Sequence, residues 1–480
     1  MTYPGQGGQW PPHDPYGQGQ PQGYPQQGGY PQQGGYPQTG PQPQQAYPQT
    51  GPQQAQQYSY GQTQYGGQYG YPAPEPPKKG KKGLVIGVVA AVVAVAAGVG
   101  ATIFFVNRNN AVAAGAENPT GAATNLVTAI GQGDVAGLLT GLAPAERDLM
   151  STLNSEATKE LVRLEVYKPD VDPNKITGFE LKAENLKFDD AAAEKVNDRI
   201  TITKLVGGTL TISSDMSKLP YTEQFIEAAF PRGMDARPQT ETVDIAKEIK
   251  ENGGEPIRIA TVNVDGEWYP SLFYSLADYA LLEADLEWPK RSIPANGAAT
   301  PGDAVRQFAD AGLAADLERV IELLPPDEMG VLHDVGPVII EQAGKLDAAP
   351  ARILELETET TDVEGGTKVL LKKLVVEAEG KTATVTKDGE CYSAEFDGES
   401  QRMCADDLTK QFLGSGMPPE VEKALTGLVK GMIENTGVVT VEVDGKWYVS
   451  PIRSMTDLMV TALKSLEAED VRALLELANG

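Results

Sequence analysis

The sequence predicts an α+β protein that contains two copies of one domain, each with helices packed on an antiparallel sheet. Three observations support this prediction: a tail almost without aliphatic side chains, an uncharged segment long enough to cross a membrane, and an internal repeat. The expected order is a disordered tail over 1–83, a transmembrane helix over 84–106, a linker over 107–118, a first repeat over 119–286, a linker over 287–299 and a second repeat over 300–480.

Residues 1–77 form a low-complexity segment of Pro, Gln, Gly and Tyr. They hold 11 of the 18 tyrosines but, apart from Met1, no Leu, Ile, Val, Met or Phe. Without aliphatic side chains, nothing offsets the ~1–2 kcal/mol of backbone entropy that each residue loses on folding. We therefore predict a disordered tail. Its spaced tyrosines suit weak multivalent contacts with a cytoplasmic partner, and an inert spacer is the alternative.

The stretch from Leu84 to Val106 is 23 residues long and carries no charge. At 1.5 Å per residue it reaches about 34 Å, enough to cross a bilayer. A lysine cluster precedes it, namely Lys78, Lys79, Lys81 and Lys82. Only Arg108 lies close on the other side. The positive-inside rule therefore predicts a single-pass cell-membrane protein with a cytoplasmic N-terminus and an extracytoplasmic C-terminal region.

The charge is concentrated beyond this span. Of 66 acids and 40 bases, two acids and five bases precede residue 109, so the rest of the chain carries 64 acids against 35 bases. Such a surface repels phosphate backbones, which excludes nucleic acid as a partner of the folded part. The acidity either keeps the outer region soluble or presents a surface to a basic partner.

The repeat is clearest near the end of each copy. ATVNVDGEWYPSLFYSLADYA, from Ala260, aligns without gaps with VTVEVDGKWYVSPIRSMTDLM, from Val439. The shared residues are Asp265, Gly266, Trp268, Tyr269, Ser275 and Asp278, which fall on Asp444, Gly445, Trp447, Tyr448, Ser454 and Asp457. Upstream, GDVAGLLTGLAPAERDLM resembles AADLERVIELLPPDEMGVL. We infer that a whole domain is duplicated.

Both copies predict the same order of elements. Asn118-Pro119 and Thr300-Pro301 are cap-plus-proline helix starts. Helices are expected over 119–142 and 144–166, over 301–324 and 326–346, and later over 222–230, 240–251, 405–413 and 419–435. Extended segments are expected from Arg199 and from Lys381.

Each copy closes on an Asp-Gly pair, which indicates a hairpin. A two-residue turn at 265–266 places Val262 and Val264 on one face with Tyr269, whereas a bulged turn would place Trp268 there. Four aromatic residues are candidates to face a ligand at the mouth of a concave sheet, namely Trp268, Tyr269, Trp447 and Tyr448. Packing in the core is the alternative for the two tryptophans.

The only two cysteines are Cys391 and Cys404, which are centred on Asp397-Gly398. A two-residue turn there places them opposite each other at a non-hydrogen-bonded position, where Cα atoms stand about 4.5 Å apart. We therefore predict a disulfide, which fits an oxidising compartment.

No motif predicts catalysis, a metal site or a cofactor. His333 is the only histidine outside the tail, so zinc sites with two or three histidines are excluded. Its place near a predicted helix end favours a structural role. Neither a nucleophile elbow, a Ser-x-x-Lys motif nor a nucleotide-binding loop is present. Carboxylates are plentiful, so a carboxylate-based hydrolase remains the least favoured alternative.

Taken together, the chain resembles actinobacterial single-pass envelope proteins that join a Pro/Gln/Gly/Tyr-rich cytoplasmic tail to extracytoplasmic α+β domains. The helices-then-strands order that ends in VDGEWY or VDGKWY is similar to the cystatin-like, nuclear-transport-factor-type superfamily. This resemblance implies a curved antiparallel sheet around a long helix, which binds small ligands or mediates association. The copies lack the acidic–histidine dyad of the enzymatic members.

We therefore expect a non-enzymatic envelope protein whose outer domains bind a protein, a wall component or an apolar ligand. The alternative from another class is transmembrane signalling, in which an outer ligand alters the partners of the tail. An apolar pocket would favour the first hypothesis, whereas a buried carboxylate pair with perturbed pKa values would favour a hydrolase.

Overall fold

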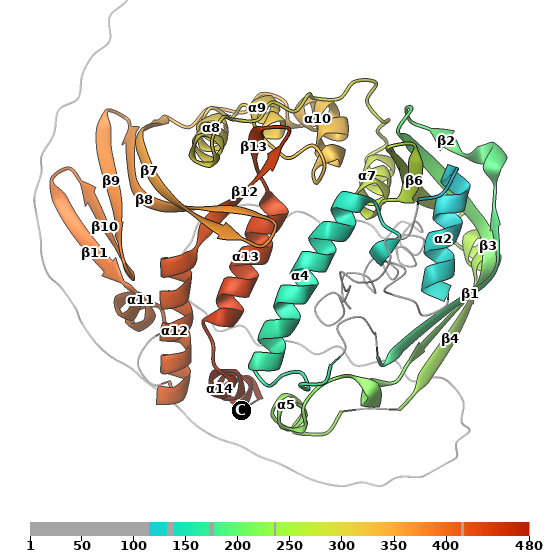
Figure 1. Ribbon diagram of the computed structural model, residues 1–480, viewed down its shortest axis with the longest axis horizontal. Coiled ribbons are helices and arrows are strands. Elements are labelled where there is room, and N and C mark those ends of the chain that lie inside the picture. Colours follow the sequence, from blue (N-terminus) through green and yellow to red (C-terminus); the bar gives the residue numbers. More distant parts are fainter. Residues whose placement is uncertain (1–114, 132–138, 172–176, 235–236, 414–416, 480) are drawn as a thin grey trace, which may run out of the picture. The chain divides into compact units, whose positions relative to one another are not determined.

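Two antiparallel sheets, one in each repeat, organise the computed structural model of the chain (Figure 1). The structure describes residues 115–131, 139–171, 177–234, 237–413 and 417–479, all within the unit Pro76–Gly480. The predicted tail and the predicted span at 84–106 lie outside these ranges. Within them, no helix is both long and apolar enough to cross a membrane. The predicted α+β class is confirmed, with one α+β domain for each repeat.

In the first repeat, a long central strand, β3, pairs with four others. The sheet order is β1-β3-β5-β6, and β2 and β4 also pair with β3. The strands are β1 (Phe179–Phe188), β2 (Glu194–Lys195), β3 (Ile200–Ser214), β4 (Gln239–Asp244), β5 (Ile257–Val264) and β6 (Glu267–Pro270). The helices are α2 (Pro119–Gly131), α4 (Pro144–Arg163), α5 (Glu223–Ala229), α6 (Ile245–Glu251) and α7 (Leu272–Glu283).

The second repeat has a seven-stranded sheet in the order β11-β10-β9-β8-β12-β13, with β7 also paired to β8. Its strands are β7 (Ala351–Val363), β8 (Gly366–Ala378), β9 (Lys381–Asp388), β10 (Cys391–Phe396), β11 (Glu399–Cys404), β12 (Gly437–Val443) and β13 (Lys446–Val449). Its helices are α8 (Pro301–Leu313), α9 (Leu317–Glu322), α10 (Gly330–Ala343), α11 (Ala405–Leu413), α12 (Pro419–Asn435), α13 (Pro451–Lys464) and α14 (Ala468–Asn479).

The β5–β6 and β12–β13 hairpins have the two-residue turn that the Asp-Gly pairs predict. Val264 pairs with Glu267, so Asp265 and Gly266 form the turn, both with positive φ. Asp444 and Gly445 repeat this geometry. Positive φ at both central residues is the requirement of the hairpin turn that matches strand twist. In both repeats the tyrosine, and not the tryptophan, therefore pairs with a valine across the hairpin, and the bulged alternative is wrong.

The segment before the first helix of each repeat pairs with the closing hairpin. Ala116 exchanges two backbone hydrogen bonds of 2.8 Å with Trp268, and Ala298 exchanges bonds of 2.8 and 2.9 Å with Trp447. A residue near the end of each predicted linker thus forms an isolated bridge to the closing hairpin. Asn118 and Thr300 cap the following helices through their side-chain oxygens, as their spacing predicts.

Two segments differ from the helices expected. The segment expected to be helical over 240–251 begins as β4, whose alternating threonines pair along β3, and only α6 is helical. The helix expected over 301–324 divides into α8 and α9. Ala315 adopts a positive φ there and Asp316 caps α9 by accepting from the Arg319 N–H at 3.0 Å. The cap at Asp316 therefore ends one helix and starts another, where the spacing of apolar residues alone predicts a single helix.

The predicted disulfide is confirmed. Phe396 pairs with Glu399 across the Asp397-Gly398 turn, which brings Cys391 opposite Cys404 with a Cα–Cα distance of 4.0 Å. The bridge closes the β10–β11 hairpin at the end remote from its turn.

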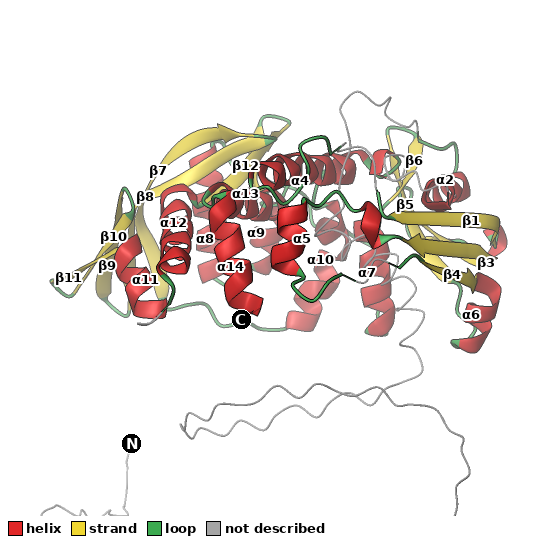
Figure 2. Cartoon of the chain, turned by 90° about the horizontal axis from the view of Figure 1, so that it is seen from below, coloured by secondary structure: helices red, strands yellow, loops and turns green. Residues whose placement is uncertain are grey.

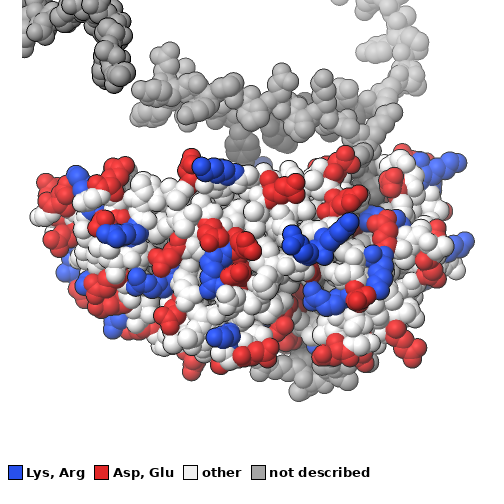
Figure 3. Space-filling view, turned by 90° about the horizontal axis from the view of Figure 1, so that it is seen from above, with Lys and Arg blue, Asp and Glu red and all other residues white. Residues whose placement is uncertain are grey.

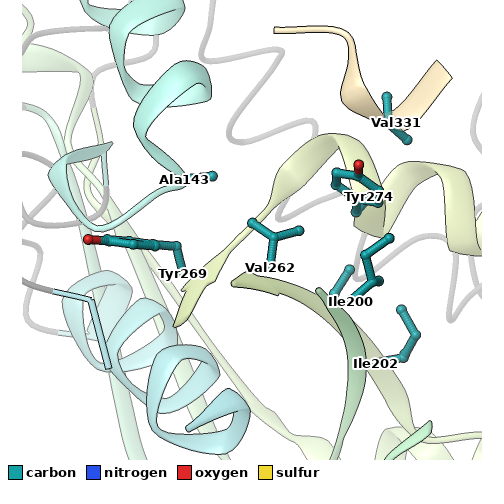
Figure 4. Packing of buried hydrophobic residues seen from close by; sticks show 8 residues of the cluster. Ala143, Ile200, Ile202, Val262, Tyr269, Tyr274 and Val331 are labelled. Carbon is teal, nitrogen blue, oxygen red and sulfur yellow. The ribbon is translucent and has the colours of Figure 1, made fainter. Parts of the chain in front are cut away.

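Helices from both repeats meet between the sheets (Figures 1 and 2). α4 of the first repeat packs along α13 of the second, and α7 contacts α10. An apolar cluster continues across this junction. Val331 of α10 packs with Ile200, Val262 and Tyr274 of the first repeat (Figure 4). The two repeats therefore share part of one hydrophobic core.

The surface keeps both signs of charge. On the face shown in Figure 3, Lys and Arg side chains are interspersed with Asp and Glu. Opposite charges also pair along both sheets, for example Lys182 with Glu184 at 2.9 Å in the first and Lys373 with Glu355 at 2.7 Å in the second. Exposed pairs of this kind contribute little to stability but keep the surface well solvated.

Candidate functional site: a cavity between the two repeats

The serines of the repeated motif hold strand and helix together. Ser271 and Ser450 are the N-caps of α7 and α13. Ser275 and Ser454, one turn later, donate their hydroxyls to the carbonyl oxygens of these caps at 2.6 and 2.7 Å. Each also accepts a backbone N–H of the neighbouring strand. These serines are therefore fully engaged in the scaffold.

The repeated aspartates each bind a cation, but the cation comes from a different strand in each repeat. Asp278 Oδ2 accepts from Arg258 Nε of β5 at 2.5 Å. Asp457 Oδ1 accepts from Lys368 Nζ of β8 at 3.1 Å. Arg258 also binds Glu194, and that hydrogen bond is the main cause that lowers the pKa of Glu194 to about 2. These ion pairs fasten α7 and α13 to their sheets.

The structure places the predicted ligand-facing aromatics on β6 and β13, namely Trp268, Tyr269, Trp447 and Tyr448. Both tyrosines are buried, and their rings lie against Gly115 and Gly297, where an added Cβ would stand 2.7 Å from the ring. Both tryptophans are half-buried, and that of β13 packs with an apolar cluster beside α8. A ligand-binding role for these four residues stays a prediction.

A cavity of about 700 Å³ lies between the two repeats, and both contribute to its wall. Its lining includes five pairs of equivalent residues, namely Pro144 and Pro326, Glu146 and Glu328, Val262 and Val441, Val264 and Val443, and Tyr274 and Arg453. This volume falls in the range of small-molecule sites. None of the four motif aromatics is among the residues that line it.

The cavity wall combines apolar side chains with charged ones, and most of the charged side chains are acidic. Among the described residues, its lining carries six carboxylates and two guanidinium groups, namely those of Glu146, Asp148, Asp265, Asp327, Glu328, Glu442, Arg199 and Arg453. Each arginine already has an acidic partner. Arg453 Nε donates to Glu328, and Arg199 Nη2 donates to Asp334 at 3.2 Å. The wall therefore keeps an excess of negative charge, in contrast to the apolar pocket that would favour our first hypothesis.

Glu146 lies at the start of α4 and reaches across to the start of α7. Its carboxylate accepts from the Ser271 hydroxyl and from the N–H groups of Leu272 at 2.8 Å and Phe273 at 3.3 Å. Glu146 is only 5% exposed to solvent. Burial raises the pKa of Glu146 to about 7, against the lowering effect of these hydrogen bonds. This carboxylate thus has hydrogen-bond donors but no cation among the described residues.

Glu328 is the counterpart of Glu146 in the second repeat and makes the same link. It accepts from the Ser450 hydroxyl at 2.5 Å, and Arg453 of α13 completes its shell with a guanidinium. That side chain lies over Gly365, where an added Cβ would stand 1.9 Å from Nη1. In the first repeat, the position of Arg453 holds Tyr274 instead.

Tyr274 joins the two repeats through Asp334. Its hydroxyl donates to Asp334 Oδ2 of α10 at 2.5 Å, and Asp334 also accepts from Arg199 and from the Ser292 hydroxyl. Burial, followed by the charge of Asp334, raises the pKa of Tyr274. Asp334 is 3% exposed, so a neutral tyrosine hydroxyl is one of the groups that solvate its charge.

Asp327 adds a further carboxylate that lacks compensation. Burial raises its pKa, and the charge of Asp444 in the nearby Asp-Gly turn raises it further. Among the described residues, neither Asp327 nor Asp444 forms an ion pair. A carboxylate at the wall with a second carboxylate behind it favours a positive ligand over a negative one.

The predicted position of His333 near the end of a helix is wrong, because it lies in the first turn of α10. Its buried ring contacts two backbone carbonyls, those of Ile293 at 2.9 Å and Leu324 at 3.0 Å. It thus fastens the segment between the repeats to the second repeat. Within the described ranges, no group of three or more His, Cys, Asp or Glu side chains is arranged to hold a metal ion.

Comparison with protein-family models, with curated proteins and with solved structures finds no match to this chain. Its site is therefore defined by its own geometry.

The sequence reasoning missed the residues that line the cavity, although part of the signal was present. Glu146 and Glu328 occupy equivalent positions in LAPAERDLM and LLPPDEMGVL, two residues after the aligned prolines. Their repetition marks a shared structural role. The partners Ser271 and Ser450 follow more than 120 residues later, so no local pattern connects them.

Proposed function

We propose that this chain is a non-enzymatic, single-pass cell-envelope protein whose paired outer repeats bind a ligand in the cavity between them. The observation that carries the proposal is a cavity of small-molecule size whose wall both repeats build from equivalent residues. The uncharged stretch at 84–106 and its lysine flank support the membrane anchor. The disulfide supports an oxidising, extracytoplasmic environment for the repeats.

The non-enzymatic part of the proposal rests on the two glutamates. A pKa near 7 at Glu146 is what a general acid or base would need. However, Glu146 and Glu328 are both fixed at the start of the following helix by the same serine contact. Because the equivalent glutamate makes the same structural contact in both repeats, we infer that it belongs to the scaffold. We further propose that both repeats belong to the cystatin-like superfamily that the sequence resembles.

Cysteine labelling in intact cells tests both the topology and the site. The native cysteines are paired, so single cysteines are introduced by Asp148→Cys and Glu442→Cys at the cavity and by Glu395→Cys on β10 as a control. With a membrane-impermeant maleimide, we expect rapid labelling at the control position. The two cavity positions should label more slowly in cells than in the purified, extensively dialysed full-length protein, because the ligand protects them.

The two parts of the proposal fail separately. Labelling of the Glu395→Cys variant only after cells are permeabilised would contradict the topology. Equal labelling rates at the cavity before and after purification would contradict ligand binding there.

A further inference from the structure

The second repeat contains a built example of how a cation binds at this cavity. Arg453 reaches from α13 to Glu328, whose other oxygen accepts from the helix-capping Ser450. The guanidinium has room because Gly365 leaves its place free of a side chain. Charge-assisted hydrogen bonds of this kind are among the stronger ones in proteins.

The first repeat contains the same carboxylate without a cation partner among the described residues. Glu146 is as deeply buried as Glu328 and has the same contact to a capping serine, Ser271. Its potential partner has been replaced, since Tyr274 stands where the second repeat has Arg453 and is committed to Asp334. The cavity wall therefore contains two equivalent buried carboxylates. A guanidinium of the protein pairs with Glu328, whereas none pairs with Glu146 among the described residues.

We propose that the ligand carries an ammonium or guanidinium group that binds beside Glu146, as Arg453 binds beside Glu328. This inference rests on the proposed function and names the class of ligand. The remaining wall favours the same charge, because Asp265, Asp327 and Glu442 add further carboxylates to it. The positive charges of Arg199 and Arg453 are already matched by Asp334 and Glu328.

The test uses two probes of nearly the same shape, butylguanidinium and butylurea, which differ in charge. Binding to the dialysed full-length protein in nanodiscs is measured by isothermal titration calorimetry. We expect butylguanidinium to bind at least tenfold more tightly than butylurea. Equal affinity for the two probes, or no binding of butylguanidinium, would overturn the inference.

Two variants locate the binding. Glu146→Gln should weaken butylguanidinium binding at least tenfold, because the carboxylate charge is lost while a hydrogen-bond acceptor remains. Tyr274→Arg should weaken this binding by a similar factor, because the new guanidinium would pair with Glu146 and compete with the ligand, as Arg453 pairs with Glu328. Glu160→Gln is the matched control, since Glu160 is a buried carboxylate on the same helix that binds Arg163 and does not line the cavity.

Thermal melts establish that each variant is folded before binding is measured. If either folded variant binds butylguanidinium as the wild type does, the site beside Glu146 is wrong. A cavity that is protected in the cysteine experiment but shows no preference for the charged probe would retain the proposed function and reject only the ligand class.

Discussion

At the scale of single residues, Glu146 and Glu328 make the same contact in the two repeats but have different neighbours. Both accept a hydroxyl from the serine that caps the following helix. Among the described residues, only Glu328 also receives a guanidinium, because the second repeat has Arg453 where the first has Tyr274. Burial without a cation raises the pKa of Glu146 to about 7.

This raised pKa predicts a pH dependence of stability. Between pH 4.5, the ordinary pKa, and about pH 7, the unfolded state loses the Glu146 proton while the folded state keeps it. Stability from this group is therefore full below pH 4.5 and falls as the pH rises to about 7, by on the order of 3 kcal/mol. Urea unfolding from pH 4.5 to 8 should show the wild type losing stability relative to Glu146→Gln over this window.

The comparison between the two proteins removes the contributions of other groups, such as Glu194, whose lowered pKa acts in a different window. A difference that stays constant from pH 4.5 to 8, or that grows in favour of the wild type, would contradict the prediction.

At the scale of elements, the Asp-Gly turns determine which side chains meet. The turn at Asp397-Gly398 has positive φ at both residues and fixes the register of β10 and β11. A shift of one residue would move every side chain of the strand to the other face. Because the register is fixed, the cysteines face each other at the end of the hairpin.

Removal of the disulfide should loosen this hairpin. For the double variant Cys391→Ser and Cys404→Ser, we expect a loss of about 3 kcal/mol, since the bridge closes a short loop in the unfolded chain. Hydrogen exchange followed by mass spectrometry should show faster exchange in β10 and β11, with β5 and β6 unchanged. Unchanged exchange in the hairpin together with an unchanged free energy of unfolding would disprove a stabilising role.

At the scale of the whole described region, Asp334 joins the two repeats. This buried carboxylate of the second repeat accepts from Tyr274 and Arg199 of the first and from Ser292 of the segment between them. The apolar contact of Val331 lies close by in the chain and extends the same junction. The repeats are therefore expected to unfold together.

Asp334→Ala should weaken that coupling. Loss of the carboxylate leaves buried donors without their acceptor, at a cost of about 2 kcal/mol. Calorimetry of the wild type should show one unfolding transition for the paired repeats, and the variant should show two. Asp310→Ala, which removes the half-exposed partner of Arg306, is the control and should keep one transition. A single transition in Asp334→Ala would show that the apolar contacts alone couple the repeats.

The sequence by itself determined what depends on local pattern and on repetition. The α+β class, the duplication, the Asp-Gly turns and the disulfide follow from the two-residue period of strands and from short-range turn chemistry. The cap-plus-proline starts at Asn118 and Thr300 are equally local. The sequence did not predict the break between α8 and α9, because capping at Asp316 overrode helical periodicity. It did not predict strand β4 either, because pairing with β3 overrode that periodicity.

Only the tertiary structure decided where the cavity lies and which charges meet there. Glu146 reaches Ser271, and Tyr274 reaches Asp334, across sequence separations of 125 and 60 residues. The first contact depends on how distant helices of one repeat pack, and the second depends on how the two repeats pack. A periodic pattern in the sequence carries no information about either. For the same reason, the motif aromatics could be located on their strands, whereas the acidic wall could be found only after the repeats were brought together.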